Sequence, residues 1–119
     1  MNETERHPAV FERDEKVLII TRRLFAGDDR RHFVGSVERY DPGAIRVRGH
    51  AFVHDVEKGG FARQKSQRTR VFPLDNHIIV FVLPFDADLS AVRYGTTKES
   101  GLVVTDGKNF KLEMNEFNA

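Results

Sequence analysis

The sequence predicts a mainly β protein: five short strands over residues 16–84 that form a small barrel or a sandwich, followed by a C-terminal extension with a short helix and a β-hairpin. Five short segments rich in β-branched and aromatic residues follow one another between turn signals. Their apolar residues recur with a period of two, as in strands that have one buried face. The chain has 119 residues, the size of one ordinary domain.

The first two expected strands cover residues 16–26 and 31–40, with a Gly-Asp-Asp turn between them. In the second strand Phe33, Gly35 and Val37 share one face. A glycine inside a strand predicts a sharp bend or a close backbone approach at Gly35. The charged residues 1–15 precede these strands, and we expect a tail or a short helix that covers one end of the barrel.

The third strand follows the turn Asp41-Pro42-Gly43, in which proline presets φ and glycine permits positive φ. One face of this strand is apolar, and the other carries Arg46, Arg48, His50, Phe52 and His54. The basic segment 57–70 contains a Gly-Gly turn and predicts a long hairpin of strands three and four. The fifth strand covers residues 78–83 and ends at Pro84, which cannot donate to a ladder.

The C-terminal extension, residues 85–119, is expected to pack on the barrel. Residues 86–94 have apolar residues at helical spacing, with Asp86 or Asp88 as a possible N-cap, and predict a short helix. The segments 102–105 and 110–114 flank a turn-forming Asp-Gly-Lys-Asn sequence, which predicts a hairpin.

Composition restricts the classes of function. There is no cysteine, which excludes a disulfide framework, a thiolate nucleophile and a cysteine-ligated metal, and fits a reducing cytoplasm. The polar N-terminal residues lack the apolar core of a signal peptide, and the longest apolar run, 78–84, falls short of the about 20 residues that span a bilayer. We therefore expect a cytoplasmic protein with no membrane partner.

The charges are unevenly distributed along the chain. Residues 1–70 hold fifteen Lys/Arg against eleven Asp/Glu, and residues 71–119 hold four against seven. This asymmetry is typical of a protein with an anionic partner, and equally of complementary surfaces between identical subunits.

Two sequence blocks carry a family resemblance. In the first block, Phe33 is followed by Gly35 two positions on, by Val37 two further and by Asp41 four beyond. In the second block, residues 74–76 (Leu-Asp-Asn) lead into the apolar run that ends at residue 83. These blocks resemble the two motifs of the Sm-like (Lsm and Hfq) superfamily, a bent Sm-like or SH3-like small barrel whose members form rings and commonly bind RNA. The resemblance implies a homo-oligomer with RNA as its ligand.

The chain also departs from that pattern at the expected nucleotide pocket. RNA-binding members have a Met-Asn pair after the motif aspartate and an Arg-Gly pair in the second motif, where this chain has Ile45-Arg46 and Asp75-Asn76. Because the inward period resumes at Ile45, we expect one extra residue in the turn and Arg46 in the place of the asparagine. The acidic Asp75 would repel phosphate. A protein-interaction or assembly module that has lost the nucleotide pocket is therefore the alternative function.

The candidate RNA-binding residues lie in three places. They are Arg46, Arg48 and Phe52 in the outward row of strand three, Arg63 and Lys65 in the basic run, and Asn76 in the second motif. The structural residues of the first motif are Phe33, Gly35, Val37, Asp41 and Gly43. A solvated surface or a subunit contact is the other interpretation of the basic residues.

No pattern of residues nominates an enzyme. The sequence lacks a nucleophile elbow, a phosphate-binding glycine loop and a zinc-protease helix. His50 and His54 on one strand would be roughly 13 Å apart, too far to share an ion at bonds of about 2 Å. We therefore expect no catalytic residues, no metal site and no cofactor.

Overall fold

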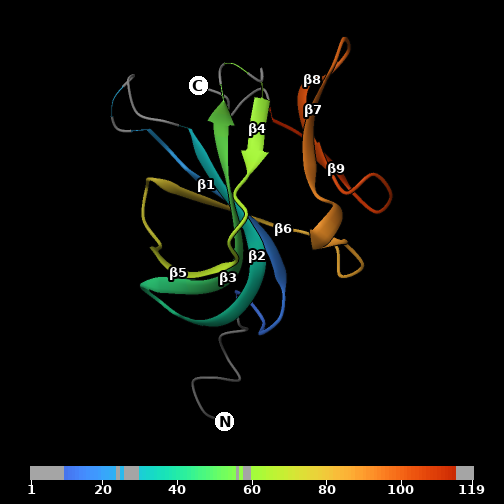
Figure 1. The fold of residues 1–119 in the computed structure, drawn as a ribbon. Helices are drawn as coiled ribbons and strands as arrows, with labels where there is room; N and C mark the ends of the chain where they lie inside the picture. The colour runs from blue at the N-terminus through green and yellow to red at the C-terminus, as the bar shows by residue number, and fades with distance from the viewer. Residues whose placement is uncertain (1–9, 24, 26–29, 56, 58–59, 115–119) are drawn as a thin grey trace.

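The computed structural model describes residues 10–23, 25, 30–55, 57 and 60–114, and folds them into two antiparallel sheets (Figure 1). The first sheet consists of β1 (Lys16–Thr21), β2 (Arg31–Asp41), β3 (Ala44–Asp55), β4 (Gly60–Arg63), β5 (Arg68–Pro73) and β6 (Ile78–Val82). The second consists of β7 (Arg93–Thr97), β8 (Gly101–Thr105) and β9 (Lys111–Glu113). One 3₁₀ turn, η1 (Leu89–Ala91), connects the sheets. The predicted mainly β class is confirmed.

The first sheet is strongly bent but is not closed into a barrel. Its strands run in the order β4-β3-β2-β1-β6, and β5 pairs with β3 on the edge that β4 also uses. The first half of β3 pairs with β5 and the second half with β4. No backbone pairing joins β5 to β6 within the described residues, so the predicted closure is not observed.

A pair of glycines brings β2 and β3 close together. Gly35 lies directly opposite Gly49 in the antiparallel register. A Cβ atom on Gly35 would lie 2.2 Å from the Arg48 carbonyl oxygen, and one on Gly49 would lie 2.0 Å from the Val34 carbonyl oxygen. The close approach expected at Gly35 is confirmed, and it needs a second glycine on the neighbouring strand.

Strand β2 contains an extra residue relative to β3, three positions before Asp41. The register of β2 against β3 shifts between Val37 and Arg39, so the inserted residue is Glu38, in a β-bulge. The turn itself is held by Asp41, whose Oδ1 accepts hydrogen bonds from the amides of Gly43 at 2.8 Å and Ala44 at 2.9 Å. Gly43 does not adopt positive φ, so the reason predicted for glycine there is wrong.

The first sheet is buried on both faces where β1 and β2 run through it. Phe11, Val17, Ile19, Phe33, Val37, Ile45, Val47 and Ala51 form an inner core on the concave side. Leu18, Ile20, Val34 and Phe52 face the other way and form an outer core with Leu83, which follows β6, and with Ala87, Val92, Val104 and Met114 from the C-terminal extension. Two-sided burial explains why β1 is an unbroken apolar run.

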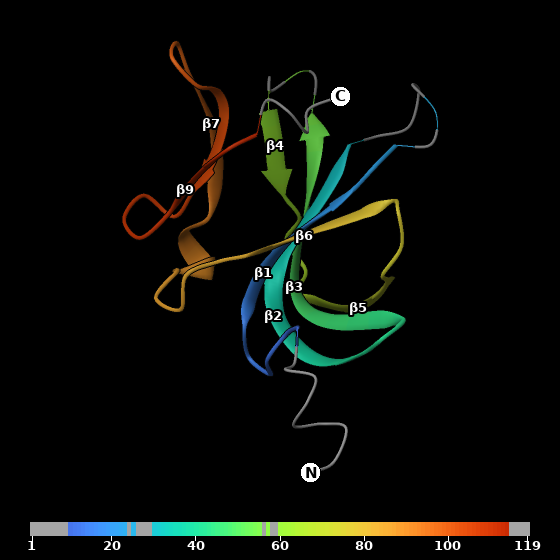
Figure 2. The ribbon, with the colours of Figure 1, turned by 180° about the vertical axis from the view of Figure 1, so that it is seen from behind.

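The second sheet covers the outer core. Seen from the front and from behind, it stands beside β4, on the other side of the first sheet from β5 (Figure 2). Lys16 joins the parts as well, since its Nζ donates to the carbonyl oxygens of Phe85 at 2.9 Å and Ala87 at 2.5 Å. The C-terminal extension therefore packs directly on the first sheet.

The C-terminal segment contains more strand than predicted. The helix expected over 86–94 is limited to η1, for which the Asp88 carboxylate accepts the N-cap hydrogen bond from the Ser90 amide at 3.1 Å. Arg93 and Tyr94 belong to β7 instead, because Tyr94 packs its ring on the outer core. The expected hairpin is present as β8 and β9.

A buried carboxylate shapes the loop between β8 and β9. Asp106 accepts hydrogen bonds from the amides of Lys108, Asn109 and Phe110, and from Asp88 on the η1 segment, at 2.7 to 3.2 Å. Burial raises the pKa of Asp106, but these four amides outweigh it and hold that pKa well below its usual range. The charged carboxylate thus ties the loop to the segment that connects the sheets.

Two sequence expectations fall partly outside the described residues. The N-terminal tail or helix over 1–15 is described only from Val10, and Phe11 there is buried against the inner core with its ring edge-on to Tyr40. The first strand was expected to reach residue 26, but β1 ends at Thr21. Among the described residues there is no helix with the length and apolar character needed to cross a bilayer.

Candidate functional site

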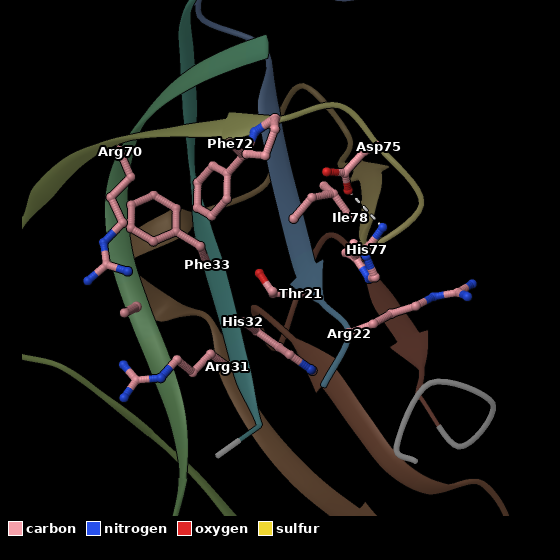
Figure 3. Close-up of a pocket in the computed structure, with 12 residues that line it drawn as sticks. Thr21, Arg22, Arg31, His32, Phe33, Arg70, Phe72, Asp75, His77 and Ile78 are labelled. Atoms are coloured by element: carbon pink, nitrogen blue, oxygen red, sulfur yellow. Dashed lines mark hydrogen bonds between the residues drawn. The ribbon is translucent and has the colours of Figure 1, made fainter. Parts of the chain in front are cut away.

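A hollow opens between β5 and β6, which do not pair with each other, and the ends of β1 and β2 lie behind it (Figure 3). Its volume is about 410 Å³, within the range of small-ligand sites. The walls are largely apolar and are formed by Phe33, Ala51, Phe72, Pro73 and Ile78. The rings of Phe33 and Phe72 lie 5.4 Å apart at an interplanar angle of 58°. Phe33 is only 2 % exposed, so the partly exposed Phe72 is the ring that the hollow offers to a planar group.

Charged side chains are arranged on opposite sides of this hollow. Arg31 and Arg70 lie on one side, and the Arg70 guanidinium is 5.9 Å from the centroid of the Phe33 ring (Figure 3). Arg22, Asp75 and His77 lie on the other side (Figure 3). The Asp75 carboxylate accepts a hydrogen bond from the His77 amide at 2.8 Å, and the Arg22 amide donates to the His77 carbonyl oxygen at 2.8 Å. These backbone contacts fix the position of the 75–77 turn against the end of β1.

A basic groove continues from the hollow along β3, β4 and β5. The groove shares Arg31, Ala51 and Arg70 with the hollow and has a volume of about 590 Å³. Its other lining residues are Asp55, Ala62, Arg63, Gln64, Lys65, Ser66 and Arg68. Five cationic side chains thus face a single carboxylate, Asp55. A surface of this charge attracts a polyanion.

The groove contains two of the sequence candidates, Arg63 and Lys65. Arg63 also has a structural role, because its guanidinium donates to the Leu89 carbonyl oxygen at 2.5 Å and lies 5.4 Å from the centroid of the Phe52 ring. Lys65 is exposed on the loop that leads into β5. Of the two, Lys65 is the residue placed to meet a ligand.

Arg46 and Arg48 do not join this groove. Both line a separate surface hollow that also contains Asp14 and Glu38. The Arg46 Nε atom lies 3.5 Å from the Glu38 Oε1 atom, in an ion pair that the bulge at Glu38 brings together. The charge of Arg46 is therefore partly compensated within the chain.

Phe52 cannot stack on a base, which corrects the sequence prediction for that residue. Its side chain is only 2 % exposed and packs in the outer core, with the Tyr94 ring centroid 5.3 Å away. The sequence placed Phe52 in an outward row, but the second sheet covers this part of β3. Asn76 is exposed in the turn after β5 and does not line the hollow beside it.

Sequence reasoning missed the convergence of Arg22, Arg31 and Arg70. Arg22 and Arg31 have the sequence pattern of ordinary surface residues, and only the pairing of β1 with β2 and β6 brings them to this opening. Phe72, which also lines the hollow, is not among the residues that the sequence nominates. A weak signal for Arg70 was its place in the basic run that leads into β5.

His32 lines the same hollow but is linked to the second sheet. Its Nδ1 atom lies 2.5 Å from the Tyr94 hydroxyl oxygen, and its ring stacks on Phe61 with centroids 4.4 Å apart. Burial, assisted by the nearby charge of Arg30, lowers the pKa of His32 to about 4, and burial raises the pKa of Tyr94. His32 is therefore neutral at pH 7 and adds no charge to the hollow.

The described segments contain no cluster of three histidine, acidic or cysteine side chains arranged to hold a metal ion. Comparison of the chain with protein-family models, with curated proteins and with solved structures finds no match. The hollow and the groove are therefore the candidate binding surfaces of the described residues.

Proposed function

We propose that the chain is a non-catalytic, Sm-like oligomeric module that binds single-stranded RNA along the basic groove and the adjoining hollow. The observation that carries this proposal is the continuity of the two, since Arg31 and Arg70 line both. A groove of cations that leads to an aromatic-walled hollow suits a strand whose phosphates follow the groove and whose base enters the hollow.

The Sm-like part of the proposal is supported by the residues of the first motif. Phe33 and Val37 are buried in the inner core, Gly35 permits the close approach to β3, and Asp41 holds the following turn. Six strands, β1 to β6, form one bent antiparallel sheet over the region of the resemblance, one more than the five that the resemblance implies. The gap between β5 and β6 leaves one edge of each strand without a backbone partner among the described residues.

Oligomerisation would account for the two strands that border this gap. Each of β5 and β6 is paired on one side only among the described residues. Val71 on β5 and Val82 on β6 are 63 % and 52 % exposed. Unpaired strand edges with exposed apolar residues favour pairing with another chain. A closed ring of identical subunits would pair β5 of one copy with β6 of the next.

The RNA proposal is tested with short labelled oligouridines by fluorescence anisotropy at salt concentrations of about 50 to 200 mM. Binding along five cations should weaken steeply with salt, with a slope of log K against log salt of about −3.5 for a single strand. Light scattering on the same samples gives the mass of the free protein and of the complex. We expect a mass of several subunits in both.

A matched pair of double variants locates the binding surface. Lys65→Glu with Arg68→Glu changes the charge of the groove, and Lys98→Glu with Lys111→Glu makes the same change of net charge on exposed residues of the second sheet. The groove variant should lose affinity and reduce the magnitude of the salt slope by about one unit or more. Equal loss of affinity in both variants would refute the groove as the binding surface.

The second candidate function is a protein-interaction or assembly module without an RNA ligand. The ion pair of Arg46 with Glu38 and the carboxylate of Asp75 favour it, because both reduce the attraction for phosphate. The same experiment separates the two functions. A multimer that binds no RNA even at the lowest salt concentration would establish the assembly module and reject the RNA proposal.

A further inference from the structure

Asp75 is the acidic residue among the twelve described residues that line the hollow. Its Oδ1 atom accepts the hydrogen bond from the His77 amide at 2.8 Å, which fixes the orientation of the carboxylate. The other oxygen, Oδ2, is left to accept hydrogen bonds from a ligand. The hollow therefore offers a fixed acceptor group at one side of an apolar space.

The charges on the two sides of the hollow determine how a nucleotide would be oriented in it. Arg31 and Arg70 lie opposite the 75–77 turn, on the side from which the basic groove continues (Figure 3). A phosphate is attracted to the arginines and repelled by Asp75. A nucleotide in the hollow would therefore place its phosphate beside Arg70, its ring against Phe72, and the far edge of its base toward Asp75.

We infer that the hollow is a base-recognition subsite that selects guanine over adenine through Asp75; this inference rests on the proposed RNA-binding function. The Watson–Crick edge of guanine presents two adjacent donors, the N1–H and the 2-amino group, and a carboxylate accepts both. Adenine presents an acceptor, N1, beside its 6-amino donor, so it offers a carboxylate one hydrogen bond and directs the N1 lone pair at the negative charge. An acidic residue that weakens phosphate binding thus acts as the specificity determinant of this site.

The test compares short oligouridines that carry one central guanosine, inosine or adenosine, with affinity measured by anisotropy. Inosine retains the N1–H donor and lacks the 2-amino group. We expect guanosine to bind about tenfold more tightly than adenosine, with inosine between them. Equal affinities for guanosine and adenosine would overturn the inference, while the salt-dependent RNA binding would still support the proposed function.

The variant Asp75→Asn tests the carboxylate with little change in shape. The asparagine oxygen can still accept the His77 amide, so thermal unfolding should be nearly unchanged, but the free group becomes an NH₂ donor. The preference for guanosine should fall from about tenfold to about onefold. Asp41→Asn is the matched control, since Asp41 also accepts backbone amides in a turn but does not line the hollow. A preference that survives Asp75→Asn, or that is lost equally in Asp41→Asn, would contradict the inference.

Discussion

At positions 35 and 49 the missing side chains determine how closely β2 and β3 can approach. A glycine in the middle of an apolar strand is visible in the sequence, and it predicted the close approach at Gly35. Gly49 has the same role, but its pairing with Gly35 could not be predicted, because the register depends on the length of the turn and on the position of the bulge. The Glu38 bulge could not be predicted from periodicity alone. The period of two shows which residues share a face of a strand, and it does not show which residues pair across strands.

Substitution of Gly35 by alanine should destabilise the protein by about 2 kcal/mol or more. The new Cβ would lie 2.2 Å from the Arg48 carbonyl oxygen, a backbone atom that cannot move without disturbing the pairing of β3. Urea unfolding followed by circular dichroism measures the loss. Gly95→Ala is the control, since Gly95 is also in a strand and has open space around its Cβ position. Equal stability of the two variants would show that the two strands can separate at little cost.

At the scale of elements, the sequence predicted strands well where one face of the strand is buried and the other is solvated. It predicted them less well where both faces are buried. The alternation in β3 correctly separated Ile45 and Val47 from Arg46 and Arg48. It failed at Phe52, because β3 is long enough to pass from a solvated surface to one covered by the second sheet. Strand β7 was missed because its polar Arg-Tyr-Gly-Thr-Thr sequence has little apolar pattern, and its place depends on contacts with β8 and β4.

The contact of β2 and β4 with β7 should make stability depend on pH through His32. The unfolded chain takes up a proton on this histidine below pH 6.5, whereas the folded protein does so only near a pKa of about 4. The contribution of neutral His32 is therefore complete above pH 6.5 and is lost as the pH falls to about 4. The difference between these pKa values corresponds to about 3 kcal/mol.

The variant His32→Asn isolates this effect from the titration of the carboxylates. It removes the titrating ring and keeps a polar group near the Tyr94 hydroxyl, so it should be less stable than the parent at pH 7. The gap between the two free energies of unfolding should then shrink by about 3 kcal/mol between pH 7 and pH 4. Curves that stay parallel over this range would contradict the role of His32, and His77→Asn, at an exposed histidine, serves as the control.

At the scale of the whole molecule, the two sheets bury one hydrophobic core between them. The sequence suggested a barrel that ends at residue 84 and an extension that packs on it. In the structure, Leu18, Ile20, Val34 and Phe52 of the first sheet are buried by residues of the C-terminal segment. The first sheet alone would expose these side chains, and an apolar face of that kind promotes aggregation.

Removal of residues 85–119 should therefore abolish cooperative folding. We expect the chain that ends at residue 84 to aggregate or to lack a thermal unfolding transition. In the full-length chain, Val104→Asp should destabilise by several kcal/mol, about 3 or more, because Val104 is 0 % exposed and a carboxylate there has no partner. Thr97→Asp on an exposed position of the same sheet should have little effect. A soluble 1–84 chain that unfolds cooperatively at the temperature of the parent would show that the first sheet is an independent domain that folds without the second sheet.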